Sequence, residues 1–162
     1  MEQRVARSPS EPGPGLSLGG YLVDRLLRAG CSTVFAVPGD FTLALLDELL
    51  RSQRMAVVGT CNELNAGYAA DGYSRATGAL GCAVATYMVG GLSLLNAVAG
   101  AAAETVPLLV VSGAPHHRDL LAGRLVHHCC GRTEVDQSSR CFRPLVRESF
   151  VVRDLEQAPA MC

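Results

Sequence analysis

The stretch TCNELNAGYAADGYSR, residues 60–75, places one acidic side chain at the start of a helix built largely from small residues. It follows the apolar run Ala56–Gly59, which we interpret as a strand. Asn62 is a favourable N-cap, so the helix is expected to begin at Glu63 and to end near Thr77. A carboxylate in the first turn is stabilised by the helix dipole, which would make Glu63 a purely local feature.

The rest of this helix favours a larger role for its acid. Alanine and glycine dominate residues 66–72, so the helix carries little side-chain bulk. Another backbone or a flat ligand could therefore approach it closely. We interpret Glu63 as a candidate for binding a partner.

Helices and strands alternate along most of the chain. We expect strands at Thr33–Val37, Ala56–Gly59, Gly81–Tyr87 and Leu108–Ser112, and helices at Leu18–Gly30, Phe41–Arg51, Asn62–Thr77 and Gly91–Ala103, with Asp40 as the N-cap of the second helix. Short connections between alternating elements predict an α/β fold with a doubly wound, mainly parallel sheet and helices on both faces. Ligands of such folds gather at the carboxyl ends of the strands.

Length and composition restrict the class of protein. A chain of 162 residues is expected to form one domain over residues 17–153, preceded by a disordered leader at 1–16 and followed by the start of a further helix or linker at 154–162. A net charge of −1 gives no electrostatic case for nucleic acid. Seven cysteines without a Cys-x-x-Cys pair or a signal peptide indicate a reducing, cytoplasmic compartment.

The segment Ala76–Ala103 contains no charged residue over 28 positions, which is longer than the roughly 20 residues of a membrane span. Five glycines and several polar side chains interrupt it, with a Gly-Gly pair near its middle. We therefore favour a strand, a turn and a helix over a span, and expect no membrane partner.

Several familiar chemistries lack their motifs in this chain. The sequence contains no Gly-x-Gly-x-x-Gly and no P-loop. The run His127-His128-Cys129-Cys130 offers zinc-ligand types, but four consecutive residues are poorly spaced for a tetrahedral ion. On local sequence the two histidines form a polar loop, although adjacent side chains point apart and an imidazole can relay protons near neutral pH.

Four segments, taken together, indicate a protein family more specifically than any one of them alone. Pro38-Gly39-Asp40, Cys61-Asn62-Glu63 with its helix, Thr86-Tyr87-Met88-Val89-Gly90-Gly91 and Val126-His127-His128 occur in this order. The set resembles the N-terminal pyrimidine-binding domain of thiamine-diphosphate-dependent 2-oxo acid decarboxylases, most closely the pyruvate decarboxylases. Two further segments, Arg140-Cys141-Phe142 and Asp154-Leu155-Glu156, resemble the plant-type members of that group. The resemblance covers about Leu18 to Ala158.

This resemblance implies roles for individual residues. Glu63 would hydrogen-bond a ring nitrogen of the cofactor's aminopyrimidine and start its activation. Asp40, His127 and His128 would orient the substrate or relay protons, with His127 nearer the cofactor. Pro38 and Val89 would contact the pyrimidine ring. The family binds thiamine diphosphate with Mg²⁺, but through a Gly-Asp-Gly motif that this sequence lacks, so no metal ligand is expected here.

The length of the chain leaves two functions open. In one, the chain is the pyrimidine half of a decarboxylase for a 2-oxo acid, most simply pyruvate. Such a fragment would be inactive alone, because in this family the cofactor lies between domains of different subunits of a homo-oligomer. In the other, it is a truncated, non-catalytic product that binds and modulates full-length subunits. Another 2-oxo acid decarboxylase, such as one acting on indolepyruvate, remains an alternative within the first.

Overall fold

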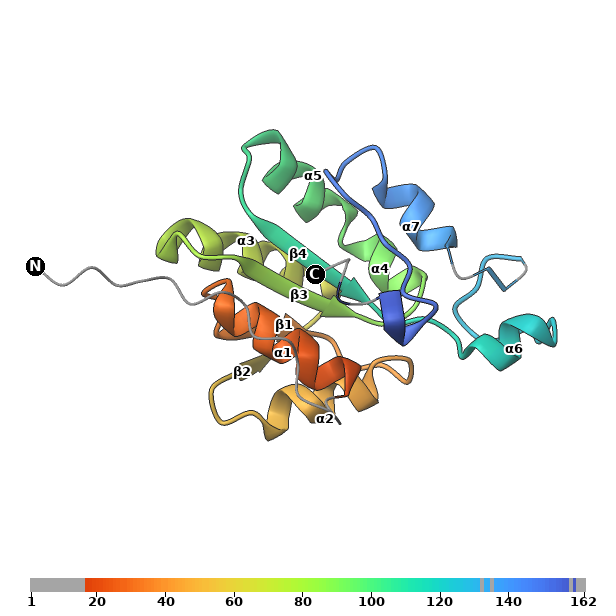
Figure 1. Cartoon of the computed structure of the whole chain (residues 1–162). Coiled ribbons are helices and arrows are strands. Elements are labelled where there is room, and N and C mark those ends of the chain that lie inside the picture. Colours follow the sequence, from red (N-terminus) through yellow and green to blue (C-terminus); the bar gives the residue numbers. More distant parts are fainter. Residues whose placement is uncertain (1–16, 132, 135, 158, 160–162) are drawn as a thin grey trace, which may run out of the picture.

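Four parallel strands form the centre of the molecule, in the spatial order β2-β1-β3-β4. The computed structural model describes residues 17–131, 133–134, 136–157 and 159, so the expected leader at 1–16 lies outside the described residues. The strands are β1 (Thr33–Ala36), β2 (Ala56–Gly59), β3 (Gly81–Ala85) and β4 (Leu108–Ser112). The α/β fold expected from the sequence is confirmed (Figure 1).

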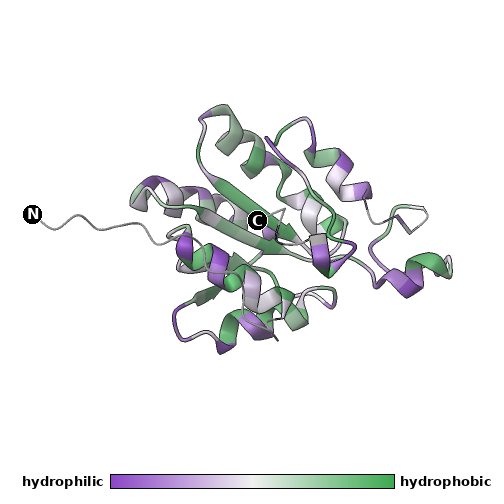
Figure 2. Ribbon diagram, in the orientation of Figure 1, coloured by the Kyte–Doolittle hydropathy of each residue, from purple (hydrophilic) through white to green (hydrophobic). Residues whose placement is uncertain are grey.

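Helices cover the two faces of this sheet. One face carries α1 (Leu18–Arg28) and α2 (Leu43–Arg51), and the other carries α3 (Glu63–Thr77), α4 (Val89–Ser93), α5 (Leu95–Ala103) and α7 (Gln137–Phe142) (Figure 1). The short helix α6 (His117–Leu121) lies beyond the end of β4, and a 3-10 turn, η1 (Leu155–Gln157), follows later in the chain. Figure 2 shows apolar strands at the centre, with polar and apolar residues mixed along α1 and α2 and mostly apolar residues along α5.

Alternation along β3 divides the core into two clusters. Cys82 and Val84 pack with α1 and α2, whereas Ala83 and Ala85 pack with α3 and α5. All five residues of β3 are buried, as expected for a central parallel strand. The sheet therefore has no solvent-facing side at its centre.

The small residues of α3 serve close packing inside the domain. A Cβ built at Gly81 would lie 2.2 Å from the carbonyl oxygen of Ala70, and one at Gly67 would lie 2.6 Å from the Cβ of Ala97. The backbone that approaches α3 is thus that of β3, with α5 beside it. The sequence predicted that another backbone or a flat ligand could approach α3 closely. In the structure, β3 and α5 of the same domain make these close contacts at Gly81 and Gly67.

Two expected helix boundaries are wrong. Asp40 is not an N-cap, because α2 begins at Leu43 after Thr42. A tight turn delays this helix: the Thr42 N–H and hydroxyl both donate to the Gly39 carbonyl, at 2.8 and 3.0 Å. The single helix expected at Gly91–Ala103 is two helices that meet at Leu94, whose fully buried side chain fills the junction.

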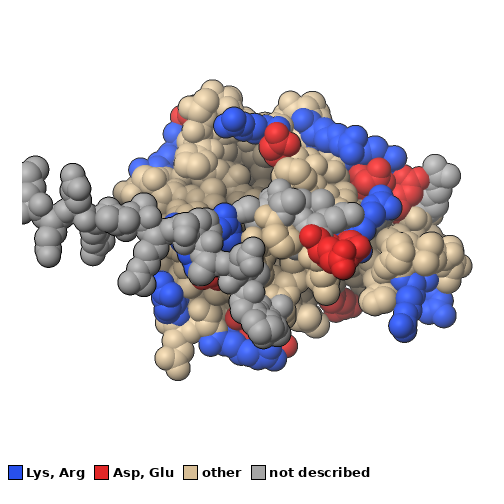
Figure 3. Space-filling view, in the orientation of Figure 1, with Lys and Arg blue, Asp and Glu red and all other residues tan. Residues whose placement is uncertain are grey.

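The uncharged segment from Ala76 to Ala103 contains the end of α3, then β3, α4 and α5. Within the part of the chain that the structure describes, no helix combines the length and apolarity that crossing a bilayer requires. On the face shown in Figure 3, basic and acidic side chains are interspersed around the rim instead of gathering in one basic patch.

Candidate functional site

The candidate site lies at the carboxyl ends of β1 and β3, where the strand order reverses direction. β1 is followed in the chain by β2 on one side, and β3 by β4 on the other. The segments after these two central strands, residues 37–42 and 86–88, are therefore neighbours, and the Val37 N–H donates to the Val84 carbonyl at 3.3 Å. Such a switch point is where open parallel sheets bind ligands.

Glu63 is the first residue of α3, as the sequence predicted. The Asn62 side chain caps the helix by accepting a 3.0 Å hydrogen bond from the Asn65 N–H. Capping is therefore performed by Asn62 and not by the neighbouring acid. The Glu63 carboxylate is half-buried and has no hydrogen bond or ion pair with any other described residue. It is a free acceptor at a helix N-terminus.

Gly90 in α4 leaves room for this carboxylate. A Cβ built at Gly90 would lie 2.9 Å from Oε1 of Glu63 and 2.6 Å from Cγ2 of Thr86. Neither distance is compatible with a real side chain. The approach of α3 to α4 at this point therefore requires glycine.

Thr86 connects the two loops of the switch point. Its side chain is buried beneath Gly39, where a Cβ would lie 2.5 Å from the Thr86 hydroxyl. This hydroxyl is buried and has no hydrogen-bond partner among the residues that the structure describes. The Thr86 backbone carbonyl accepts a hydrogen bond from the Ser112 hydroxyl at 3.0 Å, which fixes Thr86 against β4. Thr86 is thus a buried polar side chain under the Pro38-Gly39-Asp40 turn.

The second part of the site is an aromatic cluster around Phe41. The Phe41 ring stacks on His127 with centroids 4.9 Å apart, and it lies 6.3 Å from the ring of His128. Nε2 of His127 is 3.4 Å from Oδ2 of Asp40. Both of these side chains are more than half exposed, so the pair contributes little to stability and is accessible to a small molecule.

His128 is held in an unusual backbone conformation. Its φ is +69°, a left-handed value that non-glycine residues seldom adopt. Its Nδ1 is buried and finds no hydrogen-bond partner in the described part of the chain. The ring meets that of His127 edge-on, with centroids 4.6 Å apart. The two adjacent imidazoles consequently face different surroundings, as the sequence analysis expected of neighbouring side chains.

Hydrogen bonds brace the loop that carries the histidines. The Gln137 side chain accepts from the Cys130 N–H at 3.4 Å and donates to the Cys130 carbonyl at 2.9 Å. The Tyr87 hydroxyl donates to the Glu134 carbonyl at 2.7 Å, and burial raises the pKa of this hydroxyl. Glu134 also pairs with Arg140, whose pKa is raised chiefly by that hydrogen bond. The loop is therefore attached both to the segment that follows β3 and to α7.

The structure brings the predicted residues together as two neighbouring groups. Glu63 lies against Gly90, and Asp40, His127 and His128 surround Phe41. Thr86 lies between the groups, touching the positions of both Gly39 and Gly90. Pro38 and Val89 stand at the same strand ends with exposed side chains.

Sequence reasoning did not identify Thr86 and Phe41 as parts of the site. For Thr86 the available signal was one hydroxyl at the end of an apolar strand, and Phe41 carried no signal beyond its place beside Asp40. No group of three His, Cys, Asp or Glu side chains suited to a metal ion occurs among the residues placed by the structure.

Comparison with known proteins identifies the family. Residues 16–138 match the model of the thiamine pyrophosphate enzyme, N-terminal TPP binding domain. The chain therefore belongs to this family of thiamine pyrophosphate enzymes.

Comparison with individual proteins is more specific than the family match. The chain is 52% identical over 142 residues to pyruvate decarboxylase 3 of Oryza sativa subsp. indica, covering 88% of this chain and 24% of that protein. It is 47% identical over 144 residues to pyruvate decarboxylase 1 of Zea mays, covering 89% of this chain and 23% of the relative. For pyruvate decarboxylase 2 of Arabidopsis thaliana the identity is 47% over 142 residues, with coverages of 88% and 23%. The chain thus spans about a quarter of the length of these relatives.

The residues of the site fit the aminopyrimidine end of such a cofactor. Within residues 17–131, 133–134, 136–157 and 159, the Glu63 carboxylate has no partner, and neither do buried polar atoms of Thr86 and His128. Gly90 keeps the surroundings of Glu63 free of a side chain. A ring with hydrogen-bonding nitrogen atoms could engage acceptors of this kind. The match lies in the donor and acceptor set and in the space left by the glycines.

Proposed function

We propose that this chain forms the pyrimidine-binding part of a thiamine-diphosphate-dependent decarboxylase that converts pyruvate to acetaldehyde and carbon dioxide. The observation that carries the proposal is the half-buried, unpartnered Glu63 carboxylate against Gly90, in a chain of the thiamine pyrophosphate enzyme family. The names of the plant relatives support pyruvate as the substrate.

In this proposal each residue has a definite task. The Glu63 carboxylate holds a proton shared with a ring nitrogen of the aminopyrimidine. When bound, thiamine diphosphate supplies an electron sink for the electrons released as carbon dioxide leaves. His127 Nε2 and Asp40 Oδ2, 3.4 Å apart, exchange a proton with the substrate or product, and Phe41 keeps the imidazole in place by stacking. His128 provides a second imidazole beside them.

Further parts of the proposal concern the assembly. The diphosphate and Mg²⁺ would be held by a second domain, in a homo-oligomer within the cytoplasm. The chain of 162 residues, which contains no Gly-Asp-Gly, would then not decarboxylate pyruvate alone. Incubation with pyruvate, thiamine diphosphate and Mg²⁺ is expected to release no carbon dioxide above the protein-free rate. Sustained release would contradict this part.

The central experiment tests Glu63 in a complete active site. Residues 17–153 would replace the matched N-terminal segment of the Oryza sativa pyruvate decarboxylase 3, and pyruvate turnover would be measured. We expect an active chimera in which Glu63→Gln lowers kcat by about a thousandfold or more. The matched control is Glu148→Gln, which changes an exposed acid outside the site and should keep the turnover of the parent chimera. Equal rates in the two variants would remove Glu63 from the mechanism.

A second proposal is that the chain binds full-length decarboxylase subunits and modulates them. Its support is the extensive identity to proteins about four times as long. Adding the purified chain to the Oryza sativa enzyme would test it by co-elution and by activity. Separate elution with unchanged turnover would contradict it. An active chimera together with separate elution would favour the first proposal.

A further inference from the structure

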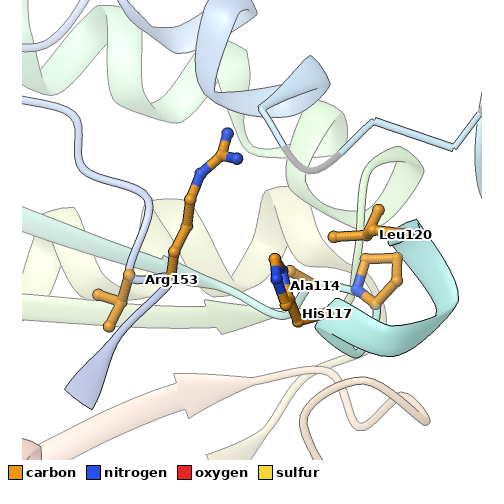
Figure 4. Close-up of a pocket in the computed structure, with 6 residues that line it drawn as sticks. Ala114, His117, Leu120 and Arg153 are labelled. Carbon is orange, nitrogen blue, oxygen red and sulfur yellow. The ribbon is translucent and has the colours of Figure 1, made fainter.

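A cavity of about 220 Å³ lies beside α6, and none of its lining residues belongs to either group of the candidate site. Its walls come from two distant segments: Ala114, Pro115, His117 and Leu120 on one side, and Val152 and Arg153 on the other. Figure 4 shows the Arg153 side chain across the cavity from His117 and Leu120. We call this space the α6 cavity.

The charge at the α6 cavity is uncompensated. Arg153 and His117 have no ion pair with any other residue that the structure describes. The nearby acids are engaged elsewhere, since Asp119 pairs with Arg124 at 3.1 Å and Asp154 accepts from the Glu156 N–H at 3.2 Å. Among the described residues, none that lines the cavity carries a carboxylate. An anion could thus meet a guanidinium and an imidazole without displacing an existing partner.

The remaining walls are apolar. Pro115 is buried, and Leu120 and Val152 are only partly covered by the rest of the chain. A hydrocarbon group placed between them would remove apolar surface from water. This volume is smaller than that of a typical pocket for a drug-sized ligand, which measures about 300 Å³ or more. A ligand that fills it must therefore be short.

We propose that the α6 cavity binds a short aliphatic carboxylate. The Arg153 guanidinium takes the carboxylate, for which its planar donor pair is suited, and a His117 ring N–H donates a further hydrogen bond. Pro115, Leu120 and Val152 hold the hydrocarbon chain. An inorganic anion would leave the apolar wall uncovered, and a neutral amide would lack the charge that strengthens hydrogen bonds from the guanidinium.

The cavity is close to the candidate site without sharing its residues. Ala114 and Pro115 follow Gly113, where a Cβ would lie 2.5 Å from the Phe41 carbonyl oxygen, and Phe41 in turn stacks on His127. Since no lining residue belongs to the group around Glu63 or to that around Phe41, this binding does not depend on the proposed decarboxylase function.

A titration of the 162-residue chain with sodium butyrate at fixed pH and ionic strength tests the proposal, with the four histidine ring signals followed by NMR. We expect a saturable shift of the His117 signals and at least about tenfold weaker binding for Arg153→Gln. Arg143→Gln, which changes an exposed arginine outside the cavity, is the matched control and should bind as the parent does. Leu120→Ala should also weaken binding, and circular dichroism would verify the fold of each variant.

Comparison of probes tests the chemical class of the ligand. Butyramide has the same chain without the charge, and inorganic phosphate has the charge without the chain, so both should bind more weakly than butyrate. Three outcomes would overturn the proposal: phosphate binding as tightly as butyrate, shifts confined to the signals of His127 and His128, or no saturable shift at all.

Discussion

The Oε1 atom of Glu63 lies directly against the backbone of Gly90, where a Cβ would approach it to 2.9 Å. The Glu63 carboxylate can therefore occupy this position only because residue 90, which lies on a different helix, has no side chain. The same Cβ would meet the Thr86 methyl at 2.6 Å, so two neighbours oppose any larger residue at position 90. Thr86 belongs to the segment after β3 at the switch point of the sheet, and Glu63 begins α3 after β2.

Gly90→Ala should consequently destabilise the domain by about 1–3 kcal/mol, because the added methyl group overpacks a buried position. Urea unfolding followed by circular dichroism measures the change. Gly100→Ala is the control, since it places the same methyl group on α5 with nothing within 4 Å. It should raise stability by up to about 1 kcal/mol through helix propensity alone. Similar shifts in both variants would contradict the proposed crowding at Gly90.

Thr86→Val tests whether the Thr86 hydroxyl has a function in the folded chain itself. The hydroxyl is buried without a partner, so replacing it with a methyl group of similar shape removes an unfavourable desolvation. We expect the free energy of unfolding to stay the same or to rise by about 1 kcal/mol. A loss of stability would show that the hydroxyl is paired. Thr86→Ser, which keeps the hydroxyl and removes the methyl group, should destabilise instead.

Asn62 and Glu63 can be separated by their effects on stability. Asn62→Ala removes the 3.0 Å cap on the Asn65 N–H and should cost about 1 kcal/mol, whereas Asn62→Asp should retain most of it. Glu63→Gln removes only the interaction of a charge with the helix dipole, so a loss of a few tenths of a kcal/mol is expected. If Glu63→Gln proves as costly as Asn62→Ala, the acid has a structural role in the isolated domain.

The sequence was sufficient for features that depend on local patterns. Helix α3 begins where Asn62 and Glu63 predicted, and all four strands lie within the apolar runs that suggested them. The alternation of helices and strands predicted that the strands are parallel. A parallel sheet places Asp40, Glu63 and Val89 at the same edge, beyond the carboxyl ends of the strands. These inferences needed only periodicity and capping chemistry.

Other features depend on contacts that periodicity does not encode. The turn that delays α2 arises from the Thr42 hydroxyl donating to Gly39, which competes with capping by Asp40. The break at Leu94 joins two segments that have the same apolar pattern. The left-handed backbone at His128 lies at a residue type that rarely adopts it, so the sequence gives no local sign of the conformation.

The buried hydroxyl of Tyr87 should produce a measurable dependence of stability on pH. Its pKa is raised, chiefly by burial, whereas in the unfolded chain it stays near the ordinary value of about 10. Above pH of about 10 the unfolded state therefore loses this proton first, and the free energy of unfolding falls as the pH rises further. Below that pH the contribution is constant.

Tyr87→Phe isolates this effect. The variant loses the hydrogen bond to the Glu134 carbonyl, so it should be less stable by about 1 kcal/mol at pH of about 8. Because phenylalanine has no proton to lose, the free energy of unfolding of the variant should fall less steeply than that of the parent chain above pH of about 10. Tyr68→Phe, at a side chain that is 52% exposed, should keep the parent slope. Urea unfolding across this pH range gives the three slopes, and identical slopes for Tyr87→Phe and the parent chain would show that Tyr87 titrates as it does in the unfolded state.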